Sequence, residues 1–184
     1  MAFGFRPSKV NGDSTNTGGF AEIPIADAYA TNIFNGDPVV LNAGNVQLVA
    51  GVPADNANPT IGPLVGCRYT TSDGEIKYAQ YYNANGGGSN TDAFAYVATN
   101  ENLWFRIESN TAFATSQVGV QYALSAGSGG STTTGNSSYI VDVNAGASAT
   151  GAVILMGCPQ DDENENSSTP VVFVKWASGT HSDF

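Results

Sequence analysis

The sequence predicts an all-β protein, folded as an antiparallel β-sandwich or small barrel built from hairpins. Apolar and polar residues alternate with period two along several short segments that are rich in aromatic and β-branched residues. Gly, Asn, Asp and Pro gather between these segments, where turns are expected. No stretch keeps the 3.6-residue period of an amphipathic helix over three turns. Short strands separated by glycine-rich turns are typical of sandwiches and barrels.

Length and composition indicate one domain with its own core. The chain has 184 residues, of which 41% are hydrophobic, and this suffices for a folded interior. Only 12% of the residues are charged, where about a quarter is typical, and 22 residues are glycine. We expect three parts: an extended N-terminal arm over 1–20, a single β domain over 21–178, and a C-terminal tail over 179–184.

The first half of the chain is expected to contribute one strand and two hairpins. A strand over 20–25 precedes a hairpin over 39–50. The most regular alternation runs from Gly62 to Tyr82, in two limbs joined by a turn at Thr71–Gly74, where Asp-Gly tolerates a positive φ. Gly66 interrupts the first limb, which indicates a β-bulge or the close approach of another backbone. The rest of the fold is organised around this hairpin.

The second half is expected to add a third hairpin and four further strands. The third hairpin joins 94–99 to 103–108 around Asn100–Asn102, and 111–117 lacks alternation and is expected to form one helical turn. A long loop rich in Gly, Ser and Thr follows at 126–138. The remaining strands are expected at 118–124, 139–143, 152–158 and 171–176.

The N-terminal arm has no periodicity but contains Phe3, Phe5 and Arg6 within a few residues. Two interpretations stay open. The segment is a disordered terminus, or it is an extended arm whose apolar side chains anchor it to a partner or a neighbouring subunit. On the second interpretation, removal of residues 1–10 leaves the β domain folded and weakens attachment.

The charge argues against a protein that wraps nucleic acid, because a phosphate-binding face needs clustered Lys and Arg. The net charge is −10, from 16 acidic and 6 basic residues. The N-terminus lacks the apolar core of a signal peptide, and no apolar run approaches transmembrane length, so we expect synthesis in the cytosol and no membrane partner. The basic residues are spread along the sequence: Arg6, Lys9, Arg68, Lys77, Arg106 and Lys175.

The residues give little support for catalysis, and we expect neither an enzyme nor a cofactor. The one histidine, His181, lies in the polar tail and has no evident Ser/His/Asp or Cys/His pairing. Cys67 and Cys158 each follow a glycine in an apolar run, which is typical of buried free thiols. A disulfide between them stays open and would need an oxidising compartment.

The sequence contains candidates for three other kinds of site. The acidic run Asp161–Asn166 is the best metal candidate, but it lacks the glycine of a helical Ca²⁺ loop, so a solvated loop is favoured. The glycine runs at 86–88 and 127–130 lack the lysine and the strand–loop–helix setting of a phosphate loop. A carbohydrate groove would be lined by aromatic residues, although such residues are more often found in the core or at an interface; the candidates are Trp104, Tyr78, Tyr81 and Tyr82.

Several sequence blocks follow one another in a set order. FGFRP near the N-terminus precedes Ile23-Pro24, then IFNGDPVVL, then PLVGCRYT with KYAQYY, and finally VVFVKW. With these blocks in this order, the chain resembles a group of tailed-bacteriophage head proteins, the capsid decoration or cement proteins. The resemblance covers most of the chain, roughly residues 3–125, and the end matches more loosely. No single block is specific, so the ordered series carries the resemblance.

The resemblance implies a β-rich virion protein that binds the outer surface of the head and stabilises the capsid lattice. The implied partners are the major capsid protein and the chain itself, as a homo-oligomer and often a homotrimer at local three-fold axes. The family supplies no catalytic residues. As a capsid-binding arm, the resemblance implies Phe3, Phe5, Arg6 and Pro7.

Other functions stay open beside this one. The first alternative is a carbohydrate- or host-surface-binding β-module of a phage head or tail fibre, which an exposed row of Trp and Tyr would favour. A major capsid subunit ranks lower, because the chain has no long predicted helix. An enzyme ranks last.

Overall fold

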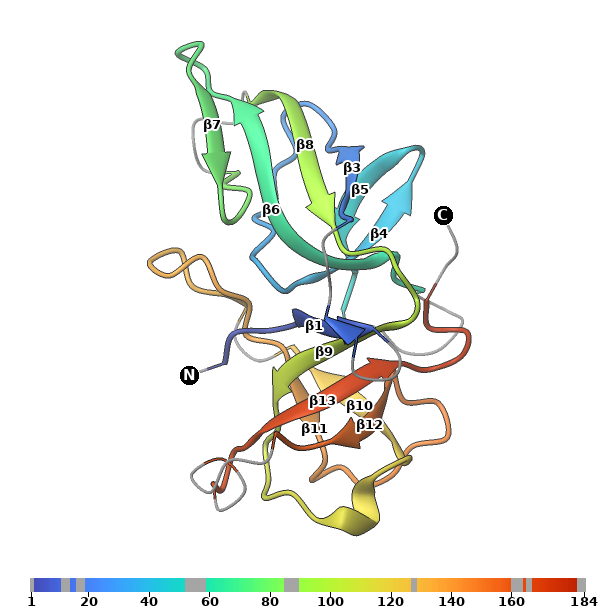
Figure 1. The fold of residues 1–184 in the computed structure, drawn as a ribbon. Coiled ribbons are helices and arrows are strands. Elements are labelled where there is room, and N and C mark those ends of the chain that lie inside the picture. The colour runs from blue at the N-terminus through green and yellow to red at the C-terminus, as the bar shows by residue number, and fades with distance from the viewer. Residues whose placement is uncertain are drawn as a thin grey trace.

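The protein is all-β, as the sequence predicts, and its strands form two antiparallel sheets, an arrangement consistent with a β-sandwich (Figure 1). A computed structural model provides the structure. A short 3₁₀ turn, η2 (Thr115–Gln117), lies where one helical turn is expected. The described residues are 2–10, 14–15, 19–51, 59–84, 90–126, 129–159, 164 and 167–181.

The first sheet has seven strands and lies in the lower part of Figure 1. All of its neighbouring strands are antiparallel. In spatial order the strands are β11 (Ile140–Asp142), β10 (Gln121–Ser125), β12 (Val153–Gly157), β13 (Val171–Trp176), β9 (Leu103–Glu108), β1 (Arg6–Val10) and β2 (Ser14–Thr15).

The second sheet has six strands and lies in the upper part of Figure 1. β6 is the longest strand and pairs with three others, β4, β7 and β8. In spatial order the strands are β3 (Ala21–Pro24), β8 (Thr91–Val97), β6 (Gly62–Thr70), β4 (Pro38–Asn42) and β5 (Asn45–Leu48), and β7 (Ile76–Ala79) pairs with β6 outside this order.

Each sheet has its own hydrophobic cluster. The strands of the seven-stranded sheet turn one side of their alternating residues inward, for example Phe105 of β9 and Val174 of β13. The cluster of the six-stranded sheet is centred on side chains such as Leu64 and Tyr82, which are fully buried. The alternation that predicts the strands therefore also sorts their residues into core and surface.

The hairpin predicted between Gly62 and Tyr82 is confirmed as β6 and β7, joined by a turn in which Gly74 has a φ of 79°. The β-bulge suggested by Gly66 is also present, because the pairing of β6 with β8 shifts between Leu64 and Gly66. Strict alternation would put Leu64 and Cys67 on different faces of the sheet. Because the bulge shifts the register between them, both side chains are buried in the core.

The third predicted hairpin is wrong in its pairing. Both of its strands exist, as β8 and β9, but β8 pairs with β3 and β6 while β9 pairs with β1 and β13. The connection through Asn100–Asn102 therefore carries the chain from one sheet to the other. The connection contains asparagine but no glycine, the residue that most readily takes the positive φ of a tight hairpin turn.

The predicted separation of an arm over 1–20 from the β domain does not describe the fold. Residues 6–10 form β1, which lies between β9 and β2 inside the seven-stranded sheet. Phe5 is 0% exposed and packs edge-on against Phe105, with 5.7 Å between ring centroids, and against Trp176 at 4.5 Å. Phe5 is therefore a core residue and not the anchor of a separate arm. The sequence near Phe5 could not reveal this, because its two aromatic partners lie far along the chain.

A buried polar junction lies where the two clusters meet. Residues 35–37 hold it together, since Asn35 is hydrogen-bonded through its backbone to Gly135 and Ser137 and through its side chain to Val65 O. The Phe5 N–H donates to Gly36 O at 3.1 Å, and a Cβ on Gly36 would lie only 2.8 Å from Phe3 O. Glycine at 36 is therefore what lets the N-terminal segment cross so closely.

The end of the chain is also held. Thr180, placed by the sequence in a C-terminal tail, is fully buried, and its carbonyl accepts a hydrogen bond of 2.7 Å from the Thr60 N–H. His181 forms an isolated bridge with Thr60. The last three positions, 182–184, lie outside the described residues.

Candidate binding surfaces

The four residues expected to form a capsid-binding arm divide into two groups. Phe5 belongs to the protein's own core and Pro7 lies in β1 opposite Phe105, so neither is a free anchor. Phe3 and Arg6 are half-buried and line one pocket at the surface. The structure therefore brings Phe3 and Arg6 together at one surface pocket.

That pocket, the Arg6–Arg106 pocket, has a volume of about 360 Å³. Arg6 in β1 stands directly opposite Arg106 in β9, and both side chains line the pocket. The guanidinium of Arg6 donates to the side-chain oxygens of Asn35 and Asn136, the latter at 2.6 Å. Burial lowers the pKa of Arg6 from its ordinary value. The walls of the pocket are completed by Phe3, Pro159, Asn164 and Val171.

The outer side of the seven-stranded sheet gathers cations that are far apart in sequence. Lys9 lies 4.5 Å above the ring of Trp104 and 4.8 Å above that of Phe173, and the Arg106 guanidinium lies 5.8 Å from Phe173. The strand register places Lys175 on the same side. Four of the six basic residues thus lie on one sheet, although they are far apart in the sequence. The alternation in β9 and β13 shows which residues face outward, but only the order of the strands shows that these outward residues are neighbours.

The hairpin of β6 and β7 carries the most exposed apolar side chains of the described residues. Ile76 is 63% exposed and Tyr78 is 76% exposed, and both point to the same side because they are two residues apart in a strand. β7 pairs only with β6, so its other edge is open among the described strands. In Figure 1 this hairpin forms the outer margin of the upper sheet. We call it the β6–β7 hairpin surface.

The aromatic residues considered for a carbohydrate groove do not form one exposed row. Tyr82 is fully buried, Trp104 is half-buried beneath Lys9, and Tyr81 stacks on Phe34 with 5.3 Å between ring centroids. Tyr78 alone is widely exposed. This distribution counts against a flat aromatic platform for sugars.

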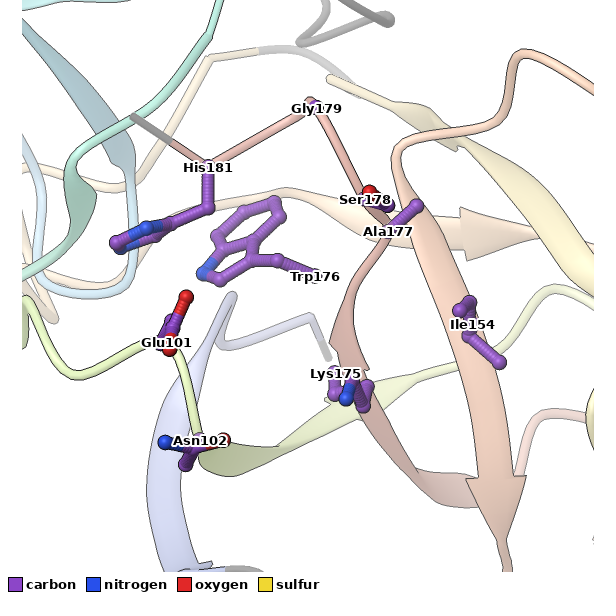
Figure 2. A pocket seen from close by; sticks show the side chains of 9 residues that line it. All are labelled: Glu101, Asn102, Ile154, Lys175, Trp176, Ala177, Ser178, Gly179 and His181. Atoms are coloured by element: carbon purple, nitrogen blue, oxygen red, sulfur yellow. The ribbon is translucent and has the colours of Figure 1, made fainter. Parts of the chain in front are cut away.

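A second pocket, of about 450 Å³, lies at the end of β13 and is lined by charged and polar residues around Trp176 (Figure 2). Trp176 is 3% exposed, and its indole N–H has no hydrogen-bond partner in the described structure. Figure 2 shows the nitrogen-bearing edge of the indole on the side of Glu101 and His181. Lys175 and Ser178 also line this Trp176 pocket.

Neither cysteine pairs with the other, and both are free thiols. Cys67 is buried in the six-stranded sheet, and burial raises its pKa to about 12, which leaves it a poor nucleophile. Cys158 follows β12 in the other sheet and accepts a hydrogen bond from Asn164 at 3.0 Å. The structure therefore contains no disulfide between Cys67 and Cys158.

No group of three or more His, Cys, Asp or Glu side chains is arranged to hold a metal ion in the portion of the chain described. The acidic candidate Asp161–Asn166 lies outside the described residues except for Asn164, and so do the glycines at 86–88 and 127. Over the same described ranges, the structure contains no helix long and apolar enough to cross a bilayer.

Comparison with protein-family models, with curated proteins and with solved structures finds no match to this chain.

Proposed function

We propose that this chain is a non-enzymatic structural protein of a bacteriophage virion, which binds the outer surface of the head and stabilises the capsid lattice as a decoration protein. The ordered sequence blocks described above support this function. A low fraction of charged residues supports it too, since few long charged side chains then lose conformational freedom when surfaces associate.

The β6–β7 hairpin surface is the observation that carries the proposal. An exposed edge strand with adjacent apolar side chains is a template for association, and soluble proteins usually protect such edges with charge, Pro or bulges. Here Lys77 provides one charge, and it forms an ion pair with Glu75 at 3.4 Å. Ile76 and Tyr78 stay uncovered on the other side. The major capsid protein is the partner that would cover them, by main-chain pairing with β7 and by burial of both side chains.

Co-sedimentation with heads that lack the protein tests this function. Saturable binding in a fixed ratio to the major capsid protein, with heads that resist heat better, is the expected result. The double substitution Ile76→Ser and Tyr78→Ser should weaken binding by at least about tenfold, since two anchors of this size account for more than 1.4 kcal/mol.

Val118→Ser provides the matched control. Val118 is 45% exposed and lies beside η2, away from the β6–β7 hairpin surface. It should leave binding to heads unchanged. Absence of any binding by the unsubstituted protein would refute the proposed function, and equal loss in the control would refute the role of the hairpin.

The Trp176 pocket supports a second candidate, a carbohydrate-binding module. A buried indole N–H without a partner needs an acceptor, and Glu101 and Lys175 together favour a neutral ligand over an ion of either sign. A sugar hydroxyl both donates and accepts hydrogen bonds, so it can supply that acceptor and also bond the exposed Glu101 carboxylate, which lines the same pocket. Titration with a panel of monosaccharides, followed by tryptophan fluorescence, should show saturable quenching that Glu101→Ala alters. A flat response to every sugar would exclude this candidate.

A further inference from the structure

We propose that the Arg6–Arg106 pocket is a binding site for an organic carboxylate, which sits between the two guanidinium groups with its apolar part against Phe3 and Val171. This inference is independent of the proposed function, since it uses none of the β6–β7 hairpin surface.

The pocket places two like charges side by side. Arg6 and Arg106 are Cα partners in adjacent antiparallel strands, so their side chains leave the same side of the sheet from neighbouring positions. Like charges directly opposite one another destabilise a sheet. Neither arginine has a carboxylate partner among the described residues, although the chain carries 16 acidic residues. Arg68 shows the contrast, because it pairs with Glu22 at 2.9 Å.

Arg6 is held in place by neutral side chains. Two of its nitrogens donate to the amide oxygens of Asn35 and Asn136, which fix the guanidinium without neutralising it. Asn35 is itself held by the hydrogen bond of 2.8 Å from its amide nitrogen to Val65 O. A cation that is positioned by neutral groups and is half-buried beside an open pocket gains most from an anion. Arg106, by comparison, is exposed, and its guanidinium lies 5.8 Å from the ring of Phe173.

The lining of the pocket selects the kind of anion. Phe3, Pro159 and Val171 supply apolar walls in the same pocket that Arg6 and Arg106 line. The Asn164 side chain already bonds the backbone of Val171: its amide nitrogen donates to Val171 O at 2.9 Å, and its amide oxygen accepts from the Val171 N–H at 2.7 Å. An inorganic ion would leave these walls uncovered. A carboxylate attached to an apolar body satisfies both parts, and the planar carboxylate matches the fork of an arginine. The volume of about 360 Å³ accommodates a body of the size of a benzene ring.

Benzoate is a suitable probe, and the Nε–H signals of arginine in a ¹⁵N NMR spectrum report the site directly. Benzoate should shift the signals of Arg6 and Arg106 saturably in the millimolar range, and sodium sulfate at equal ionic strength should shift them much less. Arg106→Gln should weaken benzoate binding by about tenfold, the loss expected for one charge-assisted contact. Arg68→Gln makes the same chemical change at an arginine that already has a carboxylate partner, and it should leave binding unchanged.

Each outcome decides the question. Saturable shifts confined to Arg6 and Arg106, lost in Arg106→Gln and kept in Arg68→Gln, establish the site. Shifts that are linear with concentration, equal for sulfate and benzoate, or equally affected by both substitutions, show general ionic screening and overturn the proposal. Phe3→Ser, at a half-buried position, separates the apolar wall from the charges: it should weaken benzoate binding and leave the weak response to sulfate as it was.

Discussion

Asp37 is the buried carboxylate of the polar junction. It is 4% exposed, and its Oδ2 accepts a hydrogen bond of 2.8 Å from the Phe34 N–H. Burial raises its pKa to about 6, and this effect outweighs the hydrogen bonds from Ser137 and from the Phe34 backbone, which act in the opposite direction. The folded state thus holds a proton at this group more strongly than the unfolded state does.

The pH dependence follows in sign from that raised pKa. Between about pH 4 and pH 6 the folded protein binds more protons at Asp37 than the unfolded chain, so this residue makes stability fall as pH rises, and the effect is complete above pH 6. The total is at most ~3 kcal/mol. Asp37→Asn should remove this dependence, because an amide does not titrate in this pH range. The amide oxygen can still accept the hydrogen bond from the Phe34 N–H, so the junction is otherwise preserved. Thermal melts of both proteins at pH 4.5 and 7.5 measure it: the variant should gain relative stability at the higher pH, and a constant difference between the two pH values contradicts the prediction.

Phe5 tests whether the N-terminal segment is part of the core. Phe5→Ala removes a fully buried ring from contact with Phe105 and Trp176, and should lower the free energy of unfolding by about 3–5 kcal/mol. Phe3→Ala is the control, since Phe3 is only half-buried at the pocket. Urea denaturation measures both. Equal and small effects in the two variants would show that the segment detaches readily.

At the scale of the elements, β1 is an interior strand that joins β2 to the rest of its sheet. Removal of residues 2–10 should therefore expose the edge of β9 and the cavity left by Phe5, and give a protein that is poorly soluble or unfolded. Circular dichroism and size-exclusion chromatography of the truncated chain measure this. A monomeric, folded truncation would restore the interpretation of the segment as a separate arm.

The same element shows what sequence reasoning can and cannot reach. Strands such as β6 and β13 were predictable because their alternation is uninterrupted or broken only by a glycine. β1 was not, since Pro7 stands within it and the pairing shifts between Pro7 and Lys9, which breaks the alternation. Partners of strands are set by contacts between distant residues, and this is why the pairing of β8 with β9 was wrong.

The candidate site shows the same limit. Arg6 stood out in the sequence beside two phenylalanines, but Arg106 did not, because it occupies an ordinary polar position of a strand. Only the register of β1 against β9 places the two cations together. A single sequence therefore indicates candidate residues but not the pairs that make a site.

At the scale of the whole molecule, two hydrophobic clusters are joined through polar and backbone contacts rather than through one continuous core. Buried polar groups of the junction include Asn35, Asp37 and Ser137. Such a junction is sensitive, because a partner left unsatisfied in a buried network costs more than the hydrogen bond itself contributes.

Asn35→Ala should weaken this junction selectively. It removes the acceptor of Arg6 and the donor to Val65 O, at a cost of about 2–4 kcal/mol. We expect the urea transition to broaden, with a lower slope, because the two sheets then lose part of their mutual support. Hydrogen exchange should show amides of β8 and β13 with similar protection in the unsubstituted protein and divergent protection in the variant. Unchanged slope and parallel protection would contradict this.

The packing of Phe5 against Trp176 also determines when the N-terminal segment can fold during translation. Trp176 follows Phe5 by nearly the whole chain and Phe105 follows it by more than half, so Phe5 leaves the ribosome long before either ring that covers it. At ordinary translation speeds the interval before Trp176 is made is roughly ten to thirty seconds. For the first part of that time β1 also lacks its neighbour β9, so the nascent chain displays an unpaired strand and an uncovered aromatic residue to chaperones at the exit tunnel. Slower synthesis of the last hundred residues should therefore lower the soluble yield of this protein more than slower synthesis of the first few.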